Sequence, residues 1–283
     1  MDIFWEGGQS GEPQLLLLLT NIKNWVNYYV NHSVNVTIMS LYLGVALGFS
    51  RSLLRKLGIV ALFHDIGYAL IPLEVTEKPG SLDAAEWELV KRHPLSAVSL
   101  IARSQESDPD ILKIIMAIFY HHKGFDLKGY PAFGPKKNDL FAEIITLVDF
   151  YDALMTSRPF RTIPMTSDQA INQLISLSGM YVNPLILKKF LQIMGDYPIG
   201  TPVLLSNGEV GVVMAQQEIT SPTKAPVVQI LMTVIGFHRE GEMVDLSQAE
   251  KLSIVRSIDP INSDLEKQWF SSIIKANLAT GGQ

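Results

Sequence analysis

The sequence predicts a mainly α-helical bundle followed by a small β-barrel-like module near the C-terminus. Between about residue 14 and residue 195, apolar residues recur with helical spacing, and helix-start signals precede several of these runs. After Gly195 the pattern changes to short apolar runs separated by turn residues. We therefore expect three segments: a flexible Gly-rich N-terminus at 1–13, a helical domain at 14–195, and a β module with a terminal helix at 196–283.

Local capping signals predict several helix ends. The expected helix starts are Asp83 with Glu86, Thr166 with Gln169, and Asn183 followed by Pro184. The first of these helices should end near Arg92, because Pro94 disfavours helical backbone at His93. The last should stop at Gly195.

A further helix is expected to start at Ser107–Pro109 and to end near the stretch "HHKG", where Gly124 can cap it. Its predicted apolar face consists of Ile111, Leu112, Ile115, Ile118 and Phe119. The adjacent residues His121 and His122 therefore fall at the end of this helix.

The β module is predicted from turn chemistry and from apolar runs. Asn207-Gly208 divides "TPVLLSNGEVGVVMA" into two short runs, which is a strong β-hairpin signal. We expect "PVVQILMTVIGF" and "KLSIV" to add further strands, and "SDLEKQWFSSIIKANL" to form the terminal helix.

Composition limits the function classes. The 283-residue chain has a net charge of −5, which argues against binding to a nucleic-acid polymer. It contains no cysteine, which excludes disulfides, iron–sulfur clusters and thiolate zinc sites. The apolar runs at 15–19 and 34–49 are shorter than the roughly 20 residues of a membrane span, so we interpret both as buried helix. We expect a cytoplasmic protein, in which the first run could also contribute to a homodimer interface.

Five of the six histidines fall in the helical part, among largely apolar residues, and two adjacent pairs are His64-Asp65 and His121-His122. Neighbours on a helix point about 100° apart, so such a pair can converge on one site only from a helix edge or end. Asp149 lies inside another apolar helix, where an isolated carboxylate is costly. A metal ion bound by imidazole and carboxylate groups explains this pattern better than separate core histidines do. The sixth, His238, is assigned to the surface of the β module.

Five motifs follow one another in the order and spacing of a known family. They are "NHSVNV", "ALFHDIGYALIP", "EKPGSLDAAEWELVKRHP", "IFYHHKGFDLKGYP" and "LVDFYDALMTSRPFR". The chain here resembles the HD-GYP domain, the branch of the HD superfamily that contains bacterial phosphodiesterases for the signalling molecule cyclic di-GMP. The resemblance covers about residues 28–195 and implies an HD-superfamily helical bundle. The stretch "YPIGTPVLLSNGEVGVV" is similar to the small tail domain that follows many HD-GYP domains.

The resemblance implies a site for two divalent metal ions, for which iron and manganese suit the donors best. The implied ligands are His32, His64, Asp65 and Asp149 for the first ion, and His93, His121 and His122 for the second. Asp65 would bridge the two ions and so take part in catalysis. The implied activity is hydrolysis of cyclic di-GMP by a hydroxide that bridges the ions.

Other residues take implied roles around this centre. Asp152 would orient a metal ligand or the nucleophile. Arg158 and Arg161, in "SRPFR", could bind phosphate through bidentate hydrogen bonds. Tyr130, from the "GYP" motif, and Lys123 would lie on the substrate side.

Several positions depart from the family pattern. Tyr68 replaces the lysine of the HD-x-G-K motif, so a neutral phenol stands at a position assigned to catalysis. Because the positive charge of that lysine is missing, we expect a reaction rate that is lower by a factor of about 10²–10³. Lys123 or Lys128 could restore the charge, although two solvated surface lysines are the simpler interpretation. Glu143 replaces an arginine and would change the local charge. Tyr28 replaces a glutamate that supports a third ion in some members, so we expect two ions.

These observations leave functions from two classes. The chain is either a cyclic di-GMP phosphodiesterase or a non-catalytic regulator that binds metal, with or without nucleotide. A third option is an HD hydrolase for another phosphoester, because the ligand set does not select the base or the ring.

Overall fold

A computed structural model describes most of the helical region and the core of the β module. The described residues are 28–102, 111–134, 136–156, 164–216, 225–232, 242–249 and 251–258. The expected flexible N-terminus, the apolar run at 15–19, Arg158, Arg161, His238 and the expected terminal helix lie outside these residues. Within them, no helix combines the length and the hydrophobicity needed to cross a membrane.

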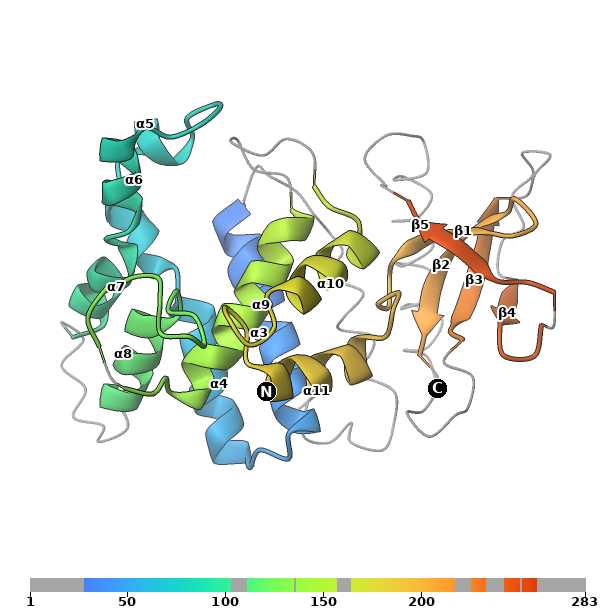
Figure 1. Ribbon diagram of the computed structural model, residues 1–283, viewed down its shortest axis with the longest axis horizontal. Helices are drawn as coiled ribbons and strands as arrows, with labels where there is room; N and C mark the ends of the chain where they lie inside the picture. Colours follow the sequence, from blue (N-terminus) through green and yellow to red (C-terminus); the bar gives the residue numbers. More distant parts are fainter. Residues whose placement is uncertain are drawn as a thin grey trace, which may run out of the picture.

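The helices and strands are labelled as in Figure 1. The helices are α3 (Tyr28–Ala46), α4 (Arg51–Phe63), the 3-10 helix η2 (Ile66–Leu70), α5 (Leu73–Thr76), α6 (Ala84–Val90), α7 (His93–Ala102), α8 (Ile111–Tyr120), α9 (Leu140–Met155), α10 (Ser167–Ser176) and α11 (Pro184–Met194). The strands are β1 (Pro202–Leu205), β2 (Val210–Ala215), β3 (Val227–Met232), β4 (Met243–Asp245) and β5 (Ile254–Ser257).

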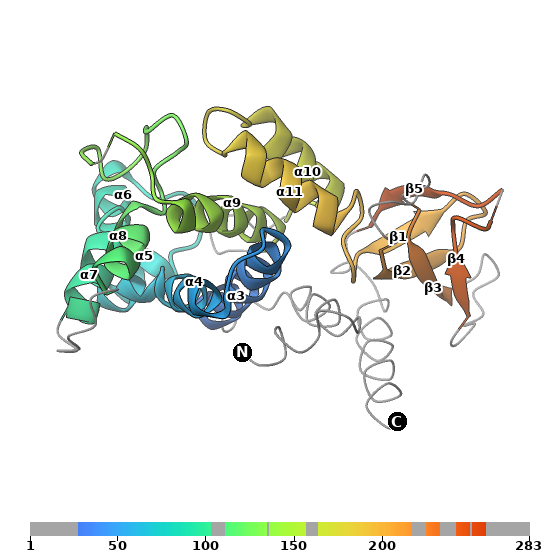
Figure 2. The same ribbon diagram turned by 90° about the horizontal axis from the view of Figure 1, so that it is seen from below.

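Helix α9 is at the centre of the bundle, and 12 of its 16 residues are buried. It contacts α3, α4, α8, α10 and α11, while α3 and α4 pack against each other as a hairpin. Figures 1 and 2 place α5 to α8 at one end of the molecule and the sheet at the other, with α10 and α11 between α9 and the sheet. The apolar run at 34–49, expected as buried helix, falls largely within α3.

The capping signals predicted the helix starts correctly. The Asp83 carboxylate accepts a hydrogen bond from the Glu86 amide at 2.9 Å, and the Glu86 carboxylate accepts one from the Asp83 amide at 2.7 Å. Thr166 forms the same kind of capping box at the start of α10. Helix α11 follows Asn183 and ends before Gly195, whose φ of 69° suits a residue without a side chain.

The apolar face predicted for α8 was partly wrong. Ile118 is buried as expected, but Leu112 is 68% exposed, and the other core-facing residues include Ile114 and Ala117. The sequence of α8 is apolar nearly all around the helix, so periodicity alone cannot select the buried face.

The β module forms one antiparallel sheet with strand order β4-β3-β2-β1-β5. The hairpin predicted at Asn207-Gly208 joins β1 to β2, with Gly208 at a φ of 83°. The sheet is open, because the outer strands β4 and β5 do not pair among the described residues. The expected barrel-like closure is therefore corrected to an open sheet. Its apolar side chains join the same buried cluster as those of the helices.

Candidate metal centre

The chain positions most of the candidate ligands at helix ends. His64 and Asp65 directly follow α4, His93 is the first residue of α7, and His121 and His122 directly follow α8. At a helix end the backbone turns, so two adjacent side chains can face one site. The expected position of His121-His122 at the end of its helix is thus confirmed.

The remaining two candidates, His32 and Asp149, project from α3 and α9, the two helices that pack together at the centre. The seven side chains form two groups in which one donor atom from each residue lies within 4.8 Å of the others. The groups are His32 with His64 and Asp149, and Asp65 with His93, His121 and His122. Five helices or their ends thus converge on one centre.

Asp65 faces both groups with different oxygen atoms. Its Oδ2 lies 3.5 Å from His64 Nε2 and 3.6 Å from His32 Nε2. Its Oδ1 lies 3.2 Å from His93 Nε2 and 3.6 Å from His121 Nε2. A carboxylate in this position can bind one ion through each oxygen.

Backbone carbonyls fix the orientation of three imidazoles. The Nδ1 atoms of His64, His93 and His121 lie 2.7, 2.8 and 2.6 Å from the carbonyl oxygens three residues earlier in the chain. A carbonyl only accepts, so each Nδ1 donates, and Nε2 of each ring is the nitrogen that faces the centre.

The donor atoms in the centre lack the hydrogen bonds that buried polar groups normally make. Within the described residues, His32 Nε2, His64 Nε2 and Asp65 Oδ1 are buried and have no hydrogen-bond partner. His93 Nε2 lies 3.4 Å from His121 Nε2 and 3.2 Å from His122 Nε2. Because Nδ1 of both His93 and His121 donates to a carbonyl, their two Nε2 atoms in the neutral rings cannot hydrogen-bond to each other, whereas a cation between them would satisfy both. The donor set therefore fits bound metal ions.

The electrostatics of the centre favour the ligand forms of most of these groups. Burial lowers the pKa of His64 to about 4 and also lowers that of His122, so both rings are neutral at pH 7. Despite burial, the surrounding histidines hold the pKa of Asp65 well below its usual range, with His64 as the largest contributor. His32 differs: burial opposes its charge, but the carboxylates of Asp149, 3.1 Å from Nε2, and Asp152, 2.7 Å from Nδ1, outweigh burial and raise its pKa to about 9.

Asp152 holds His32 from behind the centre. The fully buried Asp152 carboxylate lies 2.7 Å from His32 Nδ1 through Oδ2 and accepts a hydrogen bond from Asn35 Nδ2 at 3.1 Å through Oδ1. A carboxylate on the outer nitrogen of a ligand histidine fixes its ring and strengthens it as a donor. Asn35 was not identified from the sequence, because nothing in "NHSVNV" relates it to a residue 117 positions away.

Tyrosine rings surround the ligand histidines. Tyr68 stacks on His93 with ring centroids 4.3 Å apart, and Tyr29 packs against Tyr68 at 4.7 Å. Tyr130 packs on His122 at 4.6 Å. The side chain of His122 is 16% exposed, whereas those of the other four ligand histidines are fully buried. The centre therefore opens toward solvent on the side of His122 and Tyr130.

The two lysines of the "GYP" loop have different environments. Lys123 is buried, and its ammonium donates to the backbone carbonyls of Pro131 and Phe133 at 2.9 and 3.2 Å. The interpretation of Lys123 as a solvated surface lysine was therefore wrong. The contacts of its ammonium are with carbonyl groups inside the loop. Lys128 is exposed as that interpretation expected, with Asp126 3.4 Å away.

Glu143 also has a partner away from the ligands. Its carboxylate accepts a hydrogen bond from Asn183 Nδ2 at 2.7 Å, and Asn183 caps α11. Burial raises the pKa of Glu143. Tyr28 stacks on His32 at 5.2 Å, where it adds an aromatic surface and no carboxylate.

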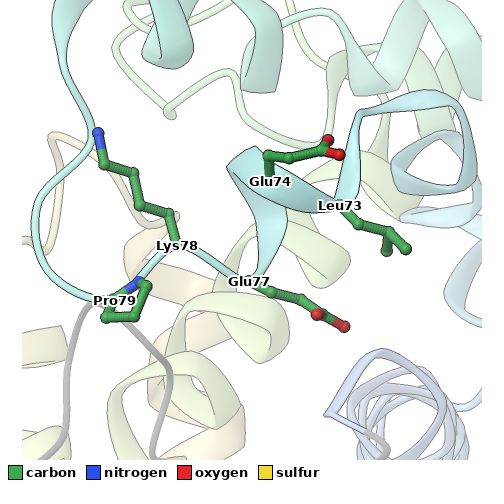
Figure 3. Close-up of a pocket in the computed structure, with 5 residues that line it drawn as sticks. All are labelled: Leu73, Glu74, Glu77, Lys78 and Pro79. Atoms are coloured by element: carbon green, nitrogen blue, oxygen red, sulfur yellow. The ribbon is translucent and has the colours of Figure 1, made fainter.

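A separate surface pocket of about 400 Å³ lies beside α5 and the turn that follows it. Its lining residues are Leu73, Glu74, Glu77, Lys78 and Pro79. Figure 3 shows Lys78 pointing away from the two glutamates, and Lys78 pairs with Glu86 outside the pocket. No candidate ligand lines this pocket, so the metal centre remains the stronger functional site.

Comparison with known proteins agrees with this geometry. Residues 18–186 match the HD domain family, and residues 202–265 match the KOW domain associated with HD domain. The chain is similar to the cyclic di-GMP phosphodiesterase PA4108 of Pseudomonas aeruginosa, at 27% identity over 91% of this chain and 62% of the relative. It is also similar to the cyclic di-GMP phosphodiesterase PdeB of Borreliella burgdorferi, at 24% identity over 85% of this chain and 60% of the relative.

The chain thus spans about three fifths of the length of these two relatives. Among solved structures, Bd1817, a HDG"Y"P protein from Bdellovibrio bacteriovorus, matches with a TM-score of 0.53 and 21% identity, covering 66% of this chain and 58% of the other. This likeness supports the fold. The matched residues extend over more than half of the sequence and include all seven clustered ligands: the chain belongs to the HD domain family.

Proposed function

We propose that this protein is a metal-dependent phosphodiesterase that hydrolyses cyclic di-GMP. The observation that carries the proposal is the pair of buried donor groups that Asp65 faces with both of its oxygens. The names of the relatives in Pseudomonas and Borreliella support the substrate.

The seven side chains would hold two divalent ions. His32, His64 and Asp149 would bind one ion, His93, His121 and His122 the other, and Asp65 both. Imidazole and carboxylate donors suit iron and manganese, which we propose as the metals. When bound, two such ions would activate a water molecule and offset the negative charge of the phosphate.

The chain itself would orient the reactants. Asp152 keeps Nε2 of His32 directed into the centre, and the carbonyl-bound histidines are held in the same way. Tyr130 presents ring surface beside His122, where a guanine base could stack, and the Tyr68 phenol beside His93 could donate to a phosphate oxygen. Arg158 and Arg161 remain our proposal for further phosphate contacts.

Product analysis tests this function directly. The protein, loaded anaerobically with Fe(II) or with Mn(II), is incubated with cyclic di-GMP, and the products are separated by chromatography. We expect linear dinucleotide or GMP from the wild type and none from D65A, because Asp65 contacts both donor groups. D245N, an aspartate substitution in β4 of the sheet, is the matched control and should retain turnover. A parallel reaction with an aryl phosphodiester detects an HD hydrolase of different specificity.

A second candidate is a regulator that binds the metals and does not turn over. Tyr68 favours it, because the stacked phenol supplies no positive charge near the phosphate. Intact cyclic di-GMP bound in stoichiometric amounts by the metal-loaded protein would support the regulator over the enzyme.

A further inference from the structure

The Lys123 ammonium is buried inside the loop that follows α8. Lys123 is only 3% exposed, and its Nζ lies 2.9, 3.5 and 3.2 Å from the carbonyl oxygens of Pro131, Ala132 and Phe133. Within the described part of the chain, no carboxylate lies within 4.0 Å of this ammonium. Three neutral carbonyls therefore take the place of a counter-ion.

Such an arrangement persists only if the carbonyls satisfy the charge. An ammonium has three N–H donors, and removing it from water without partners is strongly unfavourable. The three carbonyls match the three donors, and the ring of Tyr120 lies 6.0 Å away on another side. The ammonium then has no N–H donor left for a phosphate group, so Lys123 interacts with the loop and not with a substrate.

The backbone at Lys123 is fixed as firmly as its side chain. The Asn138 amide donates to the carbonyls of Lys123 and Gly124 at 3.0 and 2.9 Å. Lys123 also forms a β-bridge with Gly129. The side chain thus links the fixed start of the loop to residues 131–133 further along it.

This link lies next to the metal centre. Tyr130 is the residue before Pro131, and its ring packs on His122 with centroids 4.6 Å apart and meets His93 edge-on at 6.2 Å. We propose that Lys123 is a positioning residue, whose ammonium ties down residues 131–133 and thereby holds the Tyr130 ring against His122 on the substrate side of the centre. The expected effect of Lys123 on turnover rests on the proposed function, whereas its expected effect on the order of the loop does not.

The test compares K123M, which keeps the length of the side chain and removes its donors, with K128M, which removes the exposed lysine of the same loop. We expect K123M to raise the KM for cyclic di-GMP about 10-fold, the size of one lost aromatic contact with a base, with a smaller change in kcat. K128M should change neither. Metal content should stay the same in both variants, because neither residue is a ligand.

A double-variant cycle with Y130A shows whether Lys123 acts through Tyr130. If it does, K123M raises KM in the wild type and adds less than about twofold in the Y130A background. Equal effects of K123M in both backgrounds would overturn the proposal, and so would a K123M enzyme with unchanged KM.

Hydrogen exchange gives a readout that needs no turnover. We expect K123M to speed exchange of the backbone amides in residues 124–134 at least about 10-fold, while α9 keeps its protection. If the wild type does not hydrolyse the substrate, the proposed function fails, and this exchange result alone decides the inference. If K123M does not fold, K123Q, with a shorter neutral donor, takes its place. Unchanged loop exchange in the folded variant overturns the proposal.

Discussion

Replacing Asp152 with asparagine isolates the role of a carboxylate that lies behind a metal ligand. Asp152 is fully buried and accepts hydrogen bonds on both oxygens, from His32 and from Asn35. Asparagine keeps the shape of the side chain but offers only one acceptor oxygen. Either His32 or Asn35 must then face an amide N–H₂ group, so His32 loses its firm orientation or Asn35 loses its partner.

Loss of such a partner typically lowers metal affinity by 10- to 100-fold, which corresponds to about 1.4–2.8 kcal/mol. We therefore expect D152N to bind Mn(II) about 10- to 100-fold more weakly, as measured by competition with a chelator of known affinity. The double variant N35D/D152N returns an acceptor to position 35 and should recover part of the loss. D245N controls for a neutralised aspartate outside the centre.

The reasoning is refuted if D152N binds both metal ions as tightly as the wild type while remaining folded. The carboxylate would then be a structural acceptor in the core, and its distance of 2.7 Å from His32 would have no consequence for the ions.

Three further predictions address other parts of the centre. Y68K should raise kcat about tenfold or more, because it restores a cation near the phosphate, and steady-state turnover measures this. An unchanged kcat would show that a positive charge at position 68 does not stabilise the transition state. G67A should lower the metal content from two ions per chain, because any Cβ at Gly67 would lie on the backbone carbonyl of His93, and metal analysis of the folded variant checks it. E143Q should raise Tm by about 1–2 °C at pH 8 and by less at pH 4. The pKa of Glu143 is raised, so its carboxyl group destabilises the fold only at pH values where it is ionised, and the Gln amide oxygen can still accept the hydrogen bond from Asn183. A Tm difference that does not depend on pH would contradict this prediction.

The clustering of the seven candidate ligands could be predicted from the sequence because metal chemistry restricts the residue types. Only a few kinds of side chain bind iron or manganese, and their order along the chain matched a family pattern. Local signals also sufficed for helix ends, as the capping box at Asp83 shows. Each of these signals lies within a few residues of the feature that it predicts.

Features that depend on distant parts of the chain could not be predicted. Asn35 reaches Asp152 across 117 positions, and the buried face of α8 depends on which helices surround it. The short strand β4 has three residues and escaped notice, since so brief a run carries no periodicity. Whether the sheet closes depends in the same way on pairing between its first and last strands.

Lys123 and Glu143 are two further positions where the charge differs from the family pattern. Neither difference compensates for the missing lysine at position 68, so that position has to be tested separately. The ammonium of Lys123 donates hydrogen bonds to loop carbonyls, and the carboxylate of Glu143 accepts one from Asn183. Neither side chain has its charge directed at the clustered ligands, so neither offsets the missing charge at Tyr68. Under the proposed function, the metal ions held by this centre would then supply charge stabilisation of the phosphate. The ratio of kcat between Y68K and the wild type therefore measures how much transition-state stabilisation a lysine at position 68 adds to that of the rest of the site.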